Sequence, residues 1–136
     1  MNSVYAVGSS MGGYAALYYG FLYGFGGVCV TNPQTEYQSA RRHEFYNWEK
    51  QIRLCGSKFE DLPDFIFRVK GCPRVFIGHS NYPADRVAAD NFISALHERK
   101  ISYMREYSNT GDHSLYAISE NKFFNLIDYW CCENRI

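Results

Sequence analysis

Residues 4–16 read VYAVGSSMGGYAA, in which an apolar run meets a cluster of glycines and then small residues. The apolar run 4–7 predicts a short buried strand, and a helix is expected over residues 14–23. A chain that turns sharply from strand to helix needs residues without a Cβ atom at the turn. Three glycines meet that need here: Gly8, Gly12 and Gly13.

The rest of the chain repeats this alternation of strand and helix. Further strands are expected over residues 28–30, 74–77 and 101–107, and further helices over residues 84–99 and 116–130. Between the second and third strands, residues 35–58 fit one amphipathic helix and residues 65–69 a short one. The sequence therefore predicts an α/β fold: a mostly parallel sheet of about four strands, with right-handed crossovers and helices on both faces.

Length and charge limit what the protein can be. With 136 residues the chain makes one domain, and its 14 basic residues balance its 14 acidic ones. This balance leaves no basic surface for nucleic acid and no polybasic patch for a membrane. The most apolar stretch, residues 14–25, is shorter than the roughly 20 residues that span a bilayer. We therefore expect a cytoplasmic protein that binds neither nucleic acid nor membrane.

The cysteine pattern argues against a metal site. The spacing includes no C-x-x-C pair, and the odd number of cysteines fits free thiols in a reducing compartment. We therefore expect no metal and no cofactor. The five residues are Cys29, Cys55, Cys72, Cys131 and Cys132.

The turn at residues 8–12 fits the pattern G-x-S-x-G in the strand-to-helix context that this motif requires. Ser10 would then be a nucleophile, with the backbone N–H of Met11 facing an oxyanion at the helix N-terminus. Two other glycine loops fit less well, because a dinucleotide-binding turn needs glycine at position 10 and a phosphate-binding loop needs a nearby lysine. The remaining alternative is a glycine-rich turn with an incidental serine.

A nucleophilic serine needs a base and an acid that orients the base, in the chain order Ser, Asp/Glu, His. Asp85 follows the strand at 74–77, and His113 follows the strand at 101–107. The carboxyl ends of parallel strands meet at one edge, so both would lie beside Ser10. Alternatively, Asp85 caps the following helix and His113 is an ordinary loop residue. His79 precedes Asp85, which does not fit the order, and is expected to line the pocket.

Residues 5–16 resemble the central strand, elbow and helix of the α/β-hydrolase superfamily. Residues 32–34 and 111–113 resemble hydrolase-like proteins encoded with bacterial surface-polysaccharide enzymes. The resemblance implies a serine hydrolase that works through an acyl-enzyme without metal or cofactor, with Gln34 and His79 as substrate-binding residues. Residues 35–70 would form its cap-like helical insertion. The aromatic residues of that insertion either cover the pocket or form the core face of a helix: Tyr37, Phe45, Tyr46 and Trp48.

Hydrolases of this superfamily have several strands before the elbow, whereas only three residues precede Val4 here. We therefore expect residues 1–136 to be a single domain that is incomplete at its N-terminus. The first strand would lie at an exposed edge, where self-association or a partner chain could cover it. The expected activity is hydrolysis of a small-molecule or glycan ester. The alternatives are an acyltransferase and a non-catalytic hydrolase-fold module, each linked to surface-polysaccharide biosynthesis.

Overall fold

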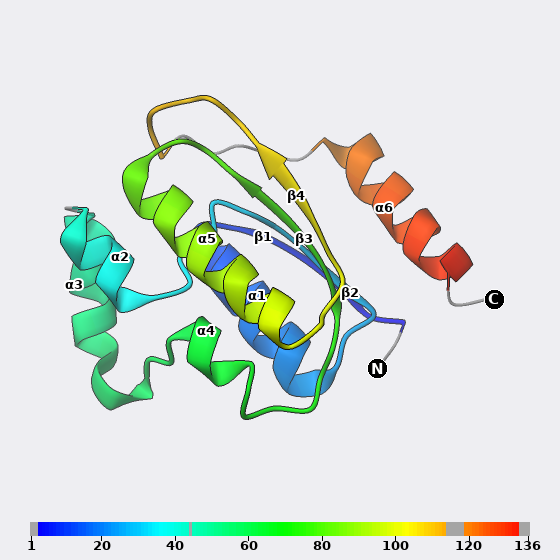
Figure 1. The fold of residues 1–136 in the computed structure, drawn as a ribbon, viewed down its shortest axis with the longest axis horizontal. Helices are drawn as coiled ribbons and strands as arrows, with labels where there is room; N and C mark the ends of the chain where they lie inside the picture. Colours follow the sequence, from blue (N-terminus) through cyan, green and yellow to red (C-terminus); the bar gives the residue numbers. More distant parts are fainter. Residues whose placement is uncertain (1–2, 44, 114–118, 134–136) are drawn as a thin grey trace.

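The computed structural model describes residues 3–43, 45–113 and 119–133, and its centre is a single sheet (Figure 1). Four strands pair in parallel, as predicted, and they lie side by side in chain order. They are β1 (Tyr5–Ser9), β2 (Gly27–Thr31), β3 (Arg74–His79) and β4 (Tyr103–Tyr107).

Helices cover both faces of this sheet, which confirms the predicted fold class. Because the sheet grows in one direction through right-handed crossovers, the connecting helices lie on the same face. These are α1 (Met11–Tyr23), α4 (Leu62–Phe65) and α5 (Pro83–Glu98), which share the larger core with Val28, Val30, Val75 and Ile77. On the opposite face α6 (Glu120–Glu133) packs against Cys29 and Phe76, the alternate residues of the same strands (Figure 1).

The predicted helix over residues 35–58 is wrong as a single element. The chain instead forms α2 (Tyr37–Arg42), α3 (Tyr46–Cys55) and a short 3₁₀ turn at Gly56–Lys58. The break lies at Phe45, whose backbone is not helical and whose amide donates to the Ala40 carbonyl at 2.9 Å.

Other boundaries shift for local reasons. The first helix begins at Met11 rather than residue 14, because the Tyr14 amide already donates to the Ser10 carbonyl at 3.1 Å. The short helix expected at 65–69 instead spans Leu62–Phe65, with proline in its first turn, where a missing N–H costs nothing. The last helix was expected from residue 116, but residues 116–118 lie outside the described part, and α6 begins at Glu120.

The outer edge of the described sheet is β1, as the sequence predicts. Whereas every residue of β2 is buried, no residue of β1 is, and Val7 is 55% exposed. At the other end of this strand Tyr5 stacks on Trp130, which lies directly over Gly27. Helix α6 is thus anchored at the start of β1 and β2 and leaves Val7 uncovered.

Two further expectations concern the chain as a whole. All five cysteines are free, and Cys29 is buried, which raises the pKa of its thiol to about 12. Among the described residues, no helix is both long and apolar enough to cross a membrane.

Candidate active site

Ser10 lies between β1 and α1 in a backbone conformation that side chains rarely adopt, with φ 53° and ψ −119°. Its amide donates to the Thr31 carbonyl at 3.0 Å, and its carbonyl accepts from the amide of Tyr14. These bonds tie the turn to β2 on one side and to α1 on the other. The sharp turn that the motif predicts is therefore present, and strain of this kind is typical of functional turns.

The three glycines of the turn have different roles. A Cβ atom on Gly8 would lie 2.2 Å from the Gly12 carbonyl oxygen, so only glycine fits there. A Cβ atom on Gly13 would lie 3.0 Å from the Cβ atom of Pro33. The expectation that Gly12 must lack a Cβ atom is wrong, because no atom lies within 4 Å of the position that this Cβ atom would take.

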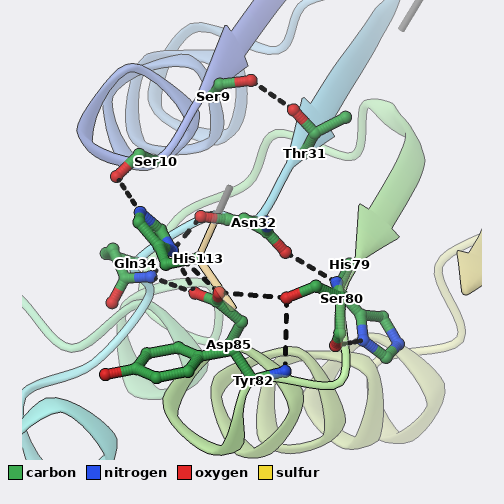
Figure 2. A network of polar contacts seen from close by, with 10 residues as sticks. All are labelled: Ser9, Ser10, Thr31, Asn32, Gln34, His79, Ser80, Tyr82, Asp85 and His113. Atoms are coloured by element: carbon green, nitrogen blue, oxygen red, sulfur yellow. Dashed lines mark hydrogen bonds and ion pairs between the residues drawn. The ribbon is translucent and has the colours of Figure 1, made fainter. Parts of the chain in front are cut away.

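The structure brings Ser10, His113 and Asp85 into one chain of contacts (Figure 2). Ser10 Oγ lies 2.8 Å from His113 Nε2, and His113 Nδ1 lies 2.7 and 2.8 Å from the two Asp85 carboxylate oxygens. The three residues come from the ends of β1 and β4 and the first turn of α5. The arrangement can transfer the Ser10 proton to a histidine held by a buried carboxylate.

Asp85 is fully buried, and its remaining hydrogen-bond capacity is filled by neutral donors (Figure 2). Gln34 Nε2 donates to Oδ1 at 2.5 Å, and Ser80 Oγ donates to Oδ2 at 3.3 Å. The backbone amide of Ser80 in turn donates to Asn32 Oδ1 at 2.7 Å. The loops after β2 and β3 thus hold this carboxylate in one orientation toward His113. The alternative that Asp85 caps the helix does not hold, because α5 has no side-chain cap hydrogen bond and Asp85 lies within its first turn.

The sequence predicts that Gln34 and His79 bind substrate, but both side chains lie away from the open space beside Ser10. Gln34 is buried under Asp85. His79 is fully buried, accepts from Arg105 Nε at 2.8 Å and donates from Nδ1 to the Ser80 carbonyl at 2.9 Å. Burial lowers the pKa of His79, which fits the neutral ring that these two bonds require. Both residues therefore support the site through hydrogen bonds: Gln34 bonds to Asp85, and His79 bonds to the Ser80 carbonyl.

A cavity of about 440 Å³ opens directly beside Ser10 and His113. The Phe45 ring forms one wall, with its centre 4.5 Å from that of His113, and Trp48 forms another. Trp48 also packs against Ala40 and Ile52 in a small core. This residue therefore both lines the pocket and belongs to the core face of its helix, the two alternatives that the sequence leaves open. The remaining lining residues are Met11, Asn47, Lys50 and Gln51.

The other two aromatic residues of the segment do not line this cavity. Tyr37 donates its hydroxyl to Glu49 at 3.3 Å, and Tyr46 is 64% exposed. Sequence reasoning missed Ser80 and Asn32, because a serine and an asparagine in loops carry no chemical signature. Their signal is positional only: each lies just beyond the carboxyl end of a strand.

The N-terminus of α1 lies directly after Ser10, at the position where the sequence predicts an oxyanion donor. Helices leave their first N–H groups without intrahelical partners, and no side chain caps α1. The Met11 N–H is the first of these, directly after Ser10, and the helix dipole favours negative charge there. Among the described residues, no group of His, Cys, Asp and Glu is arranged to hold a metal ion.

No protein-family model and no curated protein sequence matches the chain. Solved structures do match, among them the following three. Esterase PE8 aligns with a TM-score of 0.57 at 13% identity, over 92% of this chain and 47% of that one. The Francisella virulence factor BioJ aligns at 0.57 and 12%, over 99% and 53%. A variant of Arabidopsis thaliana SOBER1 aligns at 0.50 and 15%, over 96% and 53%.

The chain therefore spans about half the length of the structures that it matches. All three are α/β-hydrolase-fold proteins. At such low identity the likeness concerns the fold, and it agrees with the parallel sheet and the strained serine turn described above. The described part of this chain has the α/β-hydrolase fold.

Proposed function

We propose that this chain carries the catalytic residues of a serine hydrolase of esterase type, which cleaves a carboxylic ester through an acyl-enzyme on Ser10. The observation that carries the proposal is the continuous contact from Ser10 Oγ through His113 to buried Asp85. A serine hydroxyl is a weak nucleophile, and this contact supplies both a base and the group that orients the base.

The reaction follows from the roles of these atoms. His113 Nδ1–H donates to Asp85, so Nε2 carries the lone pair that accepts the Ser10 proton. The Ser10 oxygen attacks the ester carbonyl, and the Met11 N–H stabilises the negative charge on the carbonyl oxygen. His113 then gives its proton to the departing alcohol. Water, deprotonated by His113, attacks the acyl-serine and releases the acid and the free Ser10 hydroxyl.

Acyl transfer is the related alternative, in which a hydroxyl group, such as that of a surface glycan, replaces water. The cavity beside Ser10 is lined by polar as well as aromatic side chains and admits either acceptor. The link to surface polysaccharide stays a prediction of the sequence resemblance. Product analysis with and without an added sugar acceptor distinguishes the two reactions.

Labelling with a fluorophosphonate probe tests the proposal, because such a probe reacts with an activated serine without needing a full catalytic cycle. We expect Ser10 to be labelled, and Ser10→Ala to abolish the signal. The matched control is Ser9→Ala, since Ser9 is adjacent but bonds to Thr31 instead of histidine. His113→Ala should slow labelling by at least 10²-fold. A folded chain that is not labelled, or labelling that survives Ser10→Ala, contradicts the proposal.

A further inference from the structure

A second cavity, of about 590 Å³, lies next to the one beside Ser10. It is lined by Arg41 from α2 and by one face of α3, and Lys50 lines both cavities. On α3, Asn47 lies one turn before Lys50 and Gln51 directly follows it, and both line the first cavity. Tyr46 and Arg53 each lie one turn from Lys50 and line the second cavity. The two cavities thus adjoin at the Lys50 side chain.

The charges around this second cavity are unequal. Its acidic residue, Glu49, is largely buried and already accepts two hydrogen bonds at Oε1. One comes from Arg53 Nη2 at 2.7 Å and the other from the Tyr37 hydroxyl. Within the described residues, neither Arg41 nor Lys50 forms an ion pair. Once Glu49 and Arg53 neutralise each other, two positive charges remain, and both face the cavity.

We propose that the substrate of the Ser10 site carries a carboxylate, which binds in the second cavity against Lys50 and Arg41. This inference rests on the proposed function for the position of the ester, and it adds the charge of the substrate. The ester lies beside Ser10 and His113, its uncharged body passes the Phe45 and Trp48 rings, and the carboxylate lies beyond them. Cations that only make a surface soluble need not line a cavity. Arg41 and Lys50 both line one, and it adjoins the cavity beside Ser10.

A pair of ligands that carry no ester and differ chiefly in charge tests this inference: 4-acetamidobenzoate and the uncharged 4-acetamidobenzamide. Their binding to the Ser10→Ala chain is followed by NMR titration of backbone amides in α2 and α3. We expect the carboxylate to bind about threefold to tenfold more tightly than the carboxamide. Lys50→Gln should reduce that ratio about twofold to fivefold, and Lys50→Glu should reverse the preference. Added salt should weaken the effect, because both cations are reachable by solvent.

Lys58→Gln is the matched control, because it removes the same charge from the exposed 3₁₀ turn beyond α3 and away from both cavities. Equal binding of the two ligands, or an equal effect of Lys50→Gln and Lys58→Gln, overturns the inference. Fluorophosphonate labelling of the unmodified chain is measured in parallel. Failure of labelling contradicts the esterase proposal alone, since the titration reads the anion site without any reaction at Ser10.

Discussion

Replacing Gly8 by alanine should damage the protein far more than the same change at Gly12, although both belong to one motif. The added methyl carbon at position 8 would lie 2.2 Å from the Gly12 carbonyl oxygen, 2.4 Å from its carbon and 2.8 Å from the Gly13 nitrogen. All three are backbone atoms of the first turn of α1, so no side chain can rotate away. At position 12 the methyl carbon meets no atom within 4 Å.

The magnitudes follow from these distances. Ordinary contact begins near 3.4 Å, so relief of the shortest contact at Gly8 requires α1 and β1 to separate by about 1 Å. Overpacking in a rigid site costs about 1–3 kcal/mol, and a clash among backbone atoms belongs at the upper end. Gly12→Ala instead gains up to about 1 kcal/mol, because alanine favours the helix and the position is exposed. The two variants should differ by about 3 kcal/mol in the free energy of unfolding.

Urea unfolding followed by far-UV circular dichroism measures this difference, with fluorophosphonate labelling as a second readout. Gly8→Ala should lower the midpoint and slow labelling of Ser10, because any relief of the clash moves the turn that holds Ser10. Gly12→Ala should raise the midpoint or leave it unchanged. Equal midpoints for the two variants would refute the assignment of Gly8 as the glycine that the turn requires.

Three more predictions test the support of the site and of the sheet. Gln34→Leu keeps the volume but removes a donor from buried Asp85, so ester turnover should fall about tenfold and its pH dependence should shift, as measured by initial rates. His79 has a lowered pKa through burial, so the folded state binds fewer protons than the unfolded state; the urea midpoint should fall as pH drops below 6.5, and His79→Gln should flatten that fall. Gly27→Ala places a methyl carbon 2.4 Å from the Trp130 ring and should cost about 1–3 kcal/mol in thermal unfolding, with Gly12→Ala as the tolerated control.

Most of the sheet could be predicted from the sequence because β1, β2 and β3 contain short apolar runs, whereas β4 shows an alternating pattern that is half exposed. Strand β2 is the clearest case, since every one of its residues is buried and each is apolar or small. The segment between β2 and β3 could not be predicted as well. Its apolar residues fit one helical face, but the helix breaks at Phe45, whose ring contacts His113, a residue distant in sequence.

The residues of the site also fall into those that the sequence predicts and those that it does not. Ser10, Asp85 and His113 could be predicted because the order of the strands places three loops at one edge. The partners of Asp85 could not, because a neutral amide such as Gln34 has no distinctive chemistry until its neighbour is known. The prediction that Gln34 binds substrate reflects this: the residue lies close to the site, but its amide is used within the protein.

The described contacts separate two parts of the proposed chemistry. Activation of the nucleophile needs only Ser10, His113 and Asp85, which already lie within 2.8 Å of one another along the chain of contacts. Stabilisation of the oxyanion normally takes more than one donor, and the Met11 N–H is the one that the described residues identify. Loss of a single oxyanion donor lowers turnover by about 10²–10³-fold. Displacement of the Met11 N–H should therefore lower ester turnover more than it slows fluorophosphonate labelling of Ser10, because labelling measures chiefly the activation of the nucleophile.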